Sequence, residues 1–343
     1  MDTLAIAAAS VVAYVVINSV KRRRREIPRS KDGWRGSTMY GYVYGQYNER
    51  GTWVPVDNKL YKYNFRMSMG TVQHVHERLS AKGFCVDSTP RNPAHQVPGL
   101  FKVCVALYYM GHCKGTVKFA ADAASLGEST VQAYVDEFCD GVIAVLGPEY
   151  MPATPRGPEY LKLVRENFAA RRGVPNVAMA VDGTHVPFKV DDATTASDYL
   201  NYKHWHSILV LAFVDSLYCF VDATVGHPGK CGDNGLLQKC WLMDEIAKDP
   251  EGYLGPDGVI AADGGASDHG GFLLNPINAP TSTKEHWYNF AHSSTRFFVE
   301  QTFGMWKNRS LSLCLSLSLC LSLNFFEFVL EGKSPNCVFG TKR

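Results

Sequence analysis

Three carboxylates in the second half of the chain have surroundings suited to metal-dependent chemistry. Asp182 and Asp263 each follow a short apolar run, and each precedes a glycine that lets the backbone turn sharply and a ligand approach closely. Glu300 lies in a predicted helix, on a different stripe from the apolar residues of that helix. Clustered acids repel one another unless divalent cations hold them together. The sequence therefore favours a metal site, provided that the fold brings the three together.

The chemistry open to such a site is cleavage of a phosphodiester bond. Hard oxygen ligands with open coordination positions suit Mg²⁺ or Mn²⁺. Two such ions about 4 Å apart can activate a water or a 3′-hydroxyl and stabilise the leaving oxygen, which is the chemistry of strand cleavage and strand transfer. The alternative is that Asp182, Asp263 and Glu300 are ordinary surface acids at the ends of elements, and spacing alone leaves both interpretations open.

The elements predicted around these acids form a mixed α/β sheet. Continuous apolar runs predict strands, and apolar residues at helical spacing predict helices. The strands fall at 177–181, 207–214, 218–225 and 259–262, and the helices at 235–248 and about 293–307. Three antiparallel strands, a crossover helix and a strand parallel to the first follow the order of an RNase H-like core. A right-handed crossover would bring Asp182 and Asp263 to the same edge of the sheet.

A helical domain is predicted ahead of this sheet, over residues 60–150. Within it, residues 117–124, a tight turn containing glycine, and a helix capped at Ser129 form a helix-turn-helix pattern. DNA contact by the second helix is one interpretation, and a packed helical hairpin is the other. The second helix carries several acidic residues, which argues against contact with phosphates.

Composition sets broad limits. A chain of 343 residues is long enough for two modest domains. Its formal net charge is only +2, so any DNA-binding surface must be local. The ten cysteines include no metal-type CxxC pair, so we interpret them as reduced intracellular thiols and expect no zinc site.

Both ends of the chain depart from a globular pattern. Residues 1–26 join an apolar run, Leu4 to Val20, to a basic run suited to nuclear import or phosphate contact, or simply to solvation. The apolar run is just short of the roughly 20 residues that a spanning helix needs, so a helix packed on the domain is favoured over a membrane anchor. Residues 310–343 begin with alternating serine and leucine, which a repeated TC dinucleotide would encode. We interpret this low-complexity tail as a retained intron or a frameshift, and a cDNA matching it would contradict that hypothesis.

Five sequence blocks resemble the PIF/Harbinger family of DDE transposases. In chain order they are Asp182-Gly183-Thr184-His185; Tyr202-Lys203 with His206-Ser207; Gly226-His227-Pro228-Gly229 with Asp233; Ala262-Asp263-Gly264-Gly265; and His292 to Arg296 with Val299-Glu300. Five blocks in the right order are specific, whereas a lone Asp-Gly pair would not be. The resemblance covers about 175–309 strongly.

The resemblance implies an RNase H-like DDE nuclease domain over residues 175–309, built on a mixed five-stranded sheet with flanking helices. It makes Asp182, Asp263 and Glu300 the catalytic triad and the ligands of a divalent cation, Mg²⁺ or Mn²⁺. It also assigns four residues to DNA contact or support of the site: His185, Lys203, Arg296 and Lys307.

Two further aspartates are alternative metal ligands. Asp215 is otherwise read as a hairpin-turn residue, and Asp233 as a cap near the crossover helix. The chain also departs from the family pattern, which more often has an aromatic residue shortly after the second aspartate, where Gly265 or Ala266 stands here.

The predicted function is a metal-dependent DNA endonuclease or transposase, with strand transfer as a further step. The alternative is an inactive or truncated domesticated transposase that acts as a DNA-binding or scaffold protein, and a membrane-anchored binding protein would rest on Leu4 to Val20 alone. By resemblance the partners are DNA, a separate Myb-like DNA-binding protein and further copies of the chain. The nucleus is the expected compartment, with the cytoplasm as the alternative.

Overall fold

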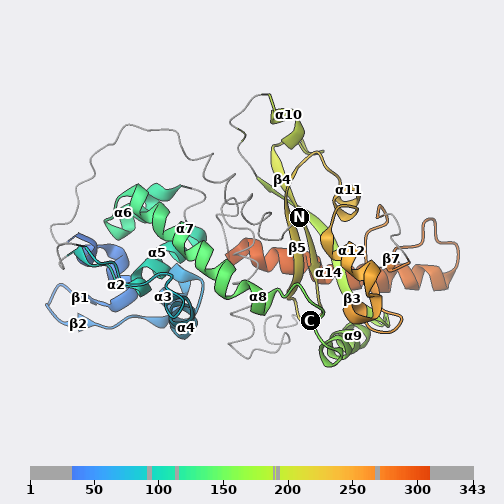
Figure 1. The fold of residues 1–343 in the computed structure, drawn as a ribbon, viewed down its shortest axis with the longest axis horizontal. Helices are drawn as coiled ribbons and strands as arrows, with labels where there is room; N and C mark the ends of the chain where they lie inside the picture. The colour runs from blue at the N-terminus through green and yellow to red at the C-terminus, as the bar shows by residue number, and fades with distance from the viewer. Residues whose placement is uncertain are drawn as a thin grey trace. The chain divides into compact units, whose positions relative to one another are not determined.

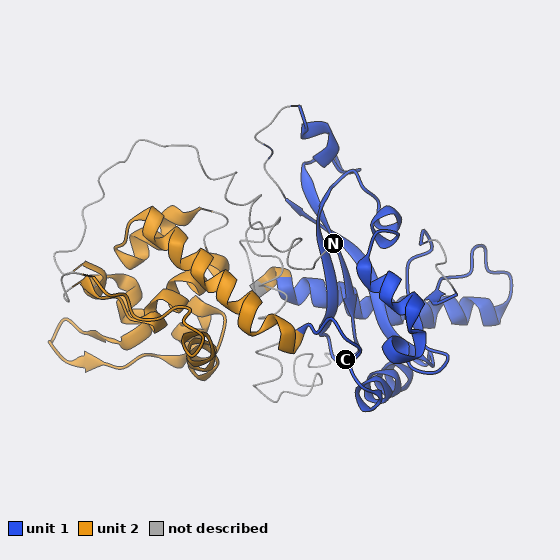
Figure 2. Cartoon of the chain, in the orientation of Figure 1, with its two compact units in different colours: residues 1–13, 151–306, 334–343 blue, residues 14–150, 307–333 orange. Residues whose placement is uncertain are grey.

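A computed structural model of the chain describes residues 33–90, 95–112, 116–187, 190, 194–266 and 271–309. The apolar run and basic run predicted before residue 26, and the tail 310–343, lie outside these ranges. Figure 2 divides the chain into two compact units, one holding residues 151–306 and the other residues 33–150 with the end of the last helix from residue 307. Across the described ranges, no helix is both long enough and apolar enough to cross a membrane.

The unit that holds residues 33–150 is helical around one buried helix. Helix α5 (Gly99–His112) is buried on nearly every side, as expected for a helix that is apolar all round. The other elements are a short 3-10 helix (Gly33–Gly36), α2 (Thr38–Tyr44), α3 (Asn58–Phe65), α4 (Met69–Ser80), α6 (Val117–Ala124), α7 (Glu128–Val145), α8 (Gly147–Tyr150) and a hairpin of β1 (Gln46–Tyr47) and β2 (Trp53–Val54).

The predicted helix-turn-helix pattern corresponds to α6 and α7, but its predicted cap is wrong. Helix α7 begins at Glu128 after an extended Gly127, so Ser129 lies inside the first turn. The chain reverses at Ser125, whose φ of 52° is left-handed and whose N–H closes the end of α6. A left-handed residue ends a helix because it turns the backbone out of the helical path.

The other unit contains the predicted mixed sheet, which confirms the fold class. Five strands lie in the order β5-β4-β3-β6-β7, with β3 antiparallel to β4 and parallel to β6. Strands β4 and β5 are antiparallel, and β6 and β7 are parallel. The strands are β3 (Val177–Pro187), β4 (Ser207–Val214), β5 (Phe220–Pro228), β6 (Val259–Ala261) and β7 (Leu273–Leu274).

Strand β3 is longer than the apolar pattern predicted. Residues 177–181 are buried, as expected for a central strand covered on both faces. The pairing with β4 continues from Asp182, opposite Ala212, to Pro187, opposite Ser207. Asp182 therefore lies inside the strand rather than after it, because backbone pairing extends the strand through residues that carry no apolar pattern.

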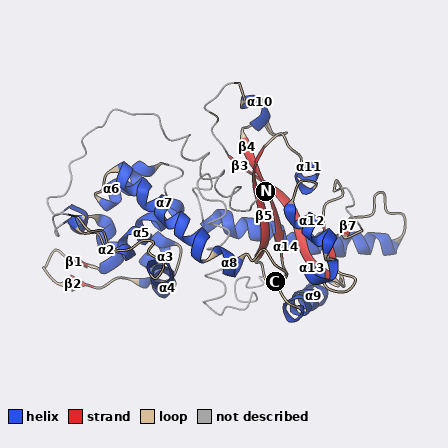
Figure 3. Cartoon of the chain, viewed as in Figure 1, coloured by secondary structure: helices blue, strands red, loops and turns tan. Residues whose placement is uncertain are grey.

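Helices cover both faces of this sheet (Figure 1; Figure 3). On one face, apolar residues of α11 (Asp233–Leu237), α12 (Trp241–Lys248) and α13 (Pro250–Leu254) form a buried cluster with the strands. Val221 packs against this cluster, whereas its neighbour Phe220 is buried on the opposite face of the sheet. There Phe220 contacts Trp306 of α14 (Thr283–Arg309), with ring centroids 6.2 Å apart.

The predicted single crossover helix is interrupted. Helix α11 ends at Leu237 and α12 begins at Trp241, so residues 238–240 make a turn between them. The break places the Trp241 indole N–H where it donates to Asp222 Oδ1 at 3.2 Å. The remaining helices are α9 (Pro158–Arg172), whose Phe168 contacts Phe298 of α14 at 5.0 Å, and the short α10 (Ala196–Tyr199).

Candidate active site

The two aspartates predicted to meet lie at the same level of neighbouring parallel strands. Ala180 of β3 pairs with Ala261 of β6, and each aspartate follows its paired alanine by two residues. Asp182 is still within β3, with its side chain 16% exposed, whereas Asp263 lies just beyond β6 and is 65% exposed. The Gly264 N–H donates to Asp263 Oδ1 at 2.8 Å and fixes the carboxylate at the strand end. The expected juxtaposition of the two aspartates is present.

Helix α14 contributes the third carboxylate. Phe298, Val299 and Trp306 are fully buried and hold the helix on the sheet. Glu300 lies on another stripe of the helix, one turn after Arg296, and is 47% exposed. Because the apolar stripe sets the rotation of the helix about its axis, it also sets the direction in which Glu300 points.

One guanidinium joins the three carboxylates. Arg296 Nη2 lies 3.2 Å from Asp182 Oδ1 and 3.3 Å from Glu300 Oε1, and its Nη1 lies 3.3 Å from Asp263 Oδ1. The carboxylates come from a strand, a loop after a second strand, and a helix. The structure therefore brings the three predicted catalytic residues together around a single positive charge.

A fourth carboxylate, Asp233, belongs to the same cluster. It is the first residue of α11, and the residue at the cap position is Gly232, so the predicted capping role does not describe it. Its side chain occupies the space beside Gly183, where an added Cβ would lie only 2.0 Å from Asp233 Oδ1. Burial raises the pKa of Asp233, His185 lowers it, and Asp263 raises it further. The glycine after Asp182 thus makes room for an acid as well as for a ligand.

Burial and the neighbouring charges shift the pKa of Asp182 in this cluster. Burial raises the pKa of Asp182 to about 6, the Arg296 guanidinium opposes that rise, and the Asp233 and Glu300 carboxylates add to it. Asp182 therefore keeps its proton to a higher pH than an exposed aspartate does, because desolvation and neighbouring acids both penalise its charged form. A second positive charge in the cluster would reverse that penalty.

Asp215 lies outside the cluster and has a structural use. Its Oδ1 accepts from Leu217 N at 2.8 Å and Cys219 N at 2.9 Å, and the Tyr160 hydroxyl donates to its Oδ2. The residue is fully buried in the turn between β4 and β5. This is the arrangement that the hairpin-turn interpretation predicted.

The four residues expected to contact DNA have different surroundings. His185 of β3 lies 3.0 Å from Ser207 Oγ through Nδ1, and its ring centroid is 5.7 Å from that of Tyr202. Lys203 lies in the loop before β4, with its ammonium 5.3 Å from the centre of the exposed Tyr202 ring. Arg296 is in the acid cluster, and Lys307 lies two turns after Glu300 on α14.

The donor set matches a hard divalent cation in kind, because all four acids offer carboxylate oxygens. Within the described ranges, no group of three or more His, Cys, Asp or Glu side chains is arranged closely enough to hold one ion. In the cluster the oxygens converge on the guanidinium of Arg296 instead. Asp182, Asp263 and Glu300, with Asp233 beside them, are the residues that could hold the metal.

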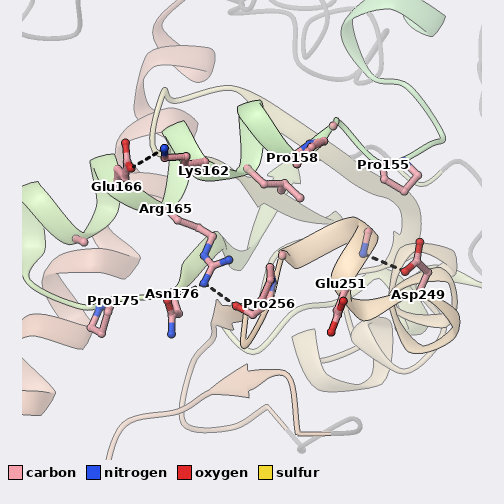
Figure 4. A pocket seen from close by; sticks show the side chains of 15 residues that line it. Pro155, Pro158, Lys162, Arg165, Glu166, Pro175, Asn176, Asp249, Glu251 and Pro256 are labelled. Carbon is pink, nitrogen blue, oxygen red and sulfur yellow. Dashed lines mark hydrogen bonds and ion pairs between the residues drawn. The ribbon is translucent and has the colours of Figure 1, made fainter.

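A large groove in this unit lies apart from the acids. It has a volume of about 640 Å³ and lies between α9 and α13 (Figure 4). Arg165 crosses it and donates from Nη2 to Asn176 Oδ1 at 2.6 Å and to Pro256 O at 2.7 Å. None of the four clustered carboxylates lines the groove. The chemistry of the unit is therefore assigned to the cluster and not to the groove.

Comparison with known proteins gives an independent view of the same region. The family model described as DDE superfamily endonuclease matches residues 181–323. The proteins named "Putative nuclease HARBI1" from Rattus norvegicus and Homo sapiens are 30% and 28% identical to the chain over 142 and 143 residues. These alignments cover 41% and 42% of this chain and 39% of each relative.

The relative from Xenopus laevis is 27% identical over 150 residues, 43% of this chain and 41% of its own length. The matches thus span about two fifths of the relatives. No solved structure matches the chain. The similarity confirms the DDE endonuclease resemblance that the sequence blocks predicted.

Proposed function

We propose, from the match of residues 181–323 to the DDE superfamily endonuclease model, that the protein is a metal-dependent DNA endonuclease that hydrolyses phosphodiester bonds. The observation that carries the proposal is the convergence of Asp182, Asp263 and Glu300, from three separate elements, on one positive charge. An ordinary surface acid has no reason to share one cation with two acids from other elements. Acids that meet in this way require a cation.

Each carboxylate is held in position by contacts of its own strand, loop or helix. Asp182 is held by the pairing of β3 with its neighbours, and Asp263 by the Gly264 N–H. Glu300 is held by the burial of Val299 beside it. A divalent metal bound by these groups would supply an activated water and stabilise the leaving oxygen. The protein itself supplies fixed ligands and a negative cluster that a divalent cation relieves.

The substrate that suits this site is a nucleic acid strand, and we propose DNA. The exposed Tyr202 ring lies against His185, whose charge in turn acts on Asp233 of the cluster. Lys203 adds a positive charge to the same loop. An exposed aromatic ring beside a basic side chain is a surface on which a base stacks while a phosphate is neutralised. We place the path of the strand along this loop.

Strand transfer is the finer form of the proposal, in which a 3′-hydroxyl takes the place of the attacking water. Choice of target by a separate Myb-like protein, assembly with further copies of the chain, and a nuclear location are proposals that rest on the family resemblance. An inactive DNA-binding protein is the second candidate function. It is favoured by the Arg296 guanidinium that fills the acid cluster.

The test is nicking of supercoiled plasmid by the purified chain with Mg²⁺ or Mn²⁺. Asp182→Asn is expected to abolish nicking, because it removes a ligand charge from the cluster. Asp215→Asn is the matched control, because it makes the same change in an acid that the turn uses, and it is expected to retain nicking. Equal activity in the native chain and in Asp182→Asn would assign the nicking to another site. No nicking by the native chain under either metal would favour the inactive DNA-binding protein.

A further inference from the structure

We propose that Arg296 is the resident cation of the metal-free site, and that its guanidinium must leave the carboxylates before divalent metal can bind. Arg296 would then be a positioning residue that sets the affinity of the site for metal. This inference rests on the proposed function, because it presumes that the same carboxylates bind metal. It goes beyond the family resemblance, which implied only support of the site or contact with DNA.

The first argument is the geometry of the guanidinium. Two of its nitrogens account for all three ion pairs, at 3.2 Å, 3.3 Å and 3.3 Å. The Arg296 side chain is only 18% exposed, so these pairs are shielded from much of the solvent. A planar guanidinium presents several donors in a fixed fork, which suits it to bridging carboxylates from different elements. One side chain therefore does for the apo site what a divalent ion would do for the loaded one.

The second argument is mutual exclusion. Mg²⁺ binds carboxylate oxygens at about 2.0–2.1 Å, so an ion held by the same oxygens would occupy the space that the guanidinium fills. An ion placed beside the guanidinium would also meet its positive charge a few ångströms away, where the repulsion is strong in a shielded site. The two cations therefore compete for one set of oxygens.

The third argument is that the guanidinium has little else to hold it in place. Its Nε is buried and has no hydrogen-bond partner among the described residues. A structural arginine ordinarily has its buried donors paired, because an unpaired buried donor is costly. The unpaired Nε, which Arg66 and Arg172 of this chain share, leaves the hydrogen bonding of Arg296 in the site incomplete. Once metal neutralises the carboxylates, the side chain loses the contacts that keep it there.

The experiment is a Mn²⁺ titration of the full chain by calorimetry, with thermal unfolding measured in the presence of chelator and of Mn²⁺. In Arg296→Gln we expect Mn²⁺ to bind about tenfold more tightly, because the variant no longer repels the ion. A change of about tenfold lies between the effects expected for one charge a few ångströms away when the screening is that of water and when it is that of a protein surface. The same variant should unfold at a lower temperature in chelator and should regain that loss with Mn²⁺. Arg165→Gln, which makes the same change in the groove that lies apart from the acids, is the matched control and should bind Mn²⁺ like the native chain.

A folded Arg296→Gln that binds Mn²⁺ equally well or more weakly would overturn the inference. If that variant is unfolded in chelator, Arg296→Lys decides the question. A single ammonium cannot bridge three carboxylates as the guanidinium does, so this variant should bind Mn²⁺ more tightly than the native chain, and equal or weaker binding would count against us.

Asp182→Asn separates the two proposals. One outcome is that the native chain binds Mn²⁺, Asp182→Asn does not, and the Arg296 variants bind Mn²⁺ as the native chain does. This outcome would overturn the resident-cation role and leave the nuclease proposal standing. Absence of Mn²⁺ binding in every protein would overturn both.

Discussion

Asp182 in β3 and Asp215 at the end of β4 lie on neighbouring antiparallel strands, yet their carboxylates have opposite surroundings. Asp215 receives two backbone N–H groups and a tyrosine hydroxyl, all from its own fold. Asp182 meets an arginine and two further acids. A buried acid whose oxygens are filled by fixed donors is a structural part of a turn. An acid that shares one guanidinium with other acids is available to a ligand from outside.

The largest effect that this comparison predicts is on catalysis. Asp263→Asn should lower metal-dependent nicking on the order of a thousandfold, since a lost metal contact is worth several kcal/mol in the transition state. Its unfolding temperature in chelator should change little, because Asp263 is mostly exposed and removal of its charge relieves repulsion. Plasmid nicking and thermal unfolding measured on the same preparation test both halves. A thousandfold loss of nicking accompanied by unfolding would mean that Asp263, like Asp215, is needed to hold the fold together.

The next effect is on stability. Asp215→Ala should destabilise the unit by about 3–4 kcal/mol, because it leaves several buried donors without a partner. Asp215→Asn should be much milder, since the amide oxygen can still accept from Leu217 N and Cys219 N. Urea unfolding of both variants measures the difference. Equal losses would mean that the charge, and not the hydrogen bonding, holds the turn.

A third prediction concerns Asp222, a second buried acid that the fold uses. Its carboxylate accepts from the Trp241 indole N–H, and burial raises its pKa from 3.8 to about 6. Because the pKa of Asp222 is higher in the folded chain, protonated Asp222 contributes fully to the free energy of unfolding below pH 3.8. That contribution is lost as the pH rises through about 6. Asp222→Asn should therefore match the native chain at pH 4 and be more stable by about 1–3 kcal/mol at pH 8. Urea titrations at the two pH values test this, and a difference that does not change with pH would contradict it.

The smallest prediction sharpens the boundary of the acid cluster. In Gly183→Ala the new Cβ would collide with the Asp233 carboxylate, so the acid must move away from the site. We expect nicking to fall about tenfold, since displacement of a carboxylate that supports the site without being a main ligand is worth about one decade. The double variant with Asp233→Ala should show no further loss, because both changes remove the same group. Additive losses would show that Gly183 acts independently of Asp233.

Much of this fold could be predicted because its strands are apolar runs. The runs at 177–181 and 259–262 identified β3 and β6, and the right-handed crossover rule placed them side by side with Asp182 near Asp263. Strand β7 was missed because two residues are too few for a pattern. The second half of β3 was missed because Gly183, Thr184 and His185 do not form an apolar pattern that would predict a strand.

The site could be predicted where the position of a residue along a strand or helix decides where its side chain lies. Asp182 and Asp263 lie where apolar runs stop, and Glu300 lies on a polar stripe of the last helix, so their meeting could be expected from topology and helix periodicity. Asp233 and Asp215 could not be told apart, because the role of each depends on which donors surround it in space. The spacing of Arg296 four residues before Glu300 was a visible signal of the ion pair on α14. Its contacts with two aspartates on other elements depend on the packing of that helix.

The position of Glu300 depends on the number of residues in α14. The helix runs for 27 residues and is tied to the sheet on both sides of Glu300, by His292, whose Nε2 lies 2.7 Å from Leu274 O, and by the buried Trp306. Each residue of an α-helix turns the next by about 100°. Insertion or deletion of one codon between those two anchors would swing Glu300 away from the aspartates while leaving every catalytic residue in the sequence. Related chains should therefore vary in length within the connections between elements, and a chain that gains or loses one residue in this helix loses its glutamate as surely as by substitution.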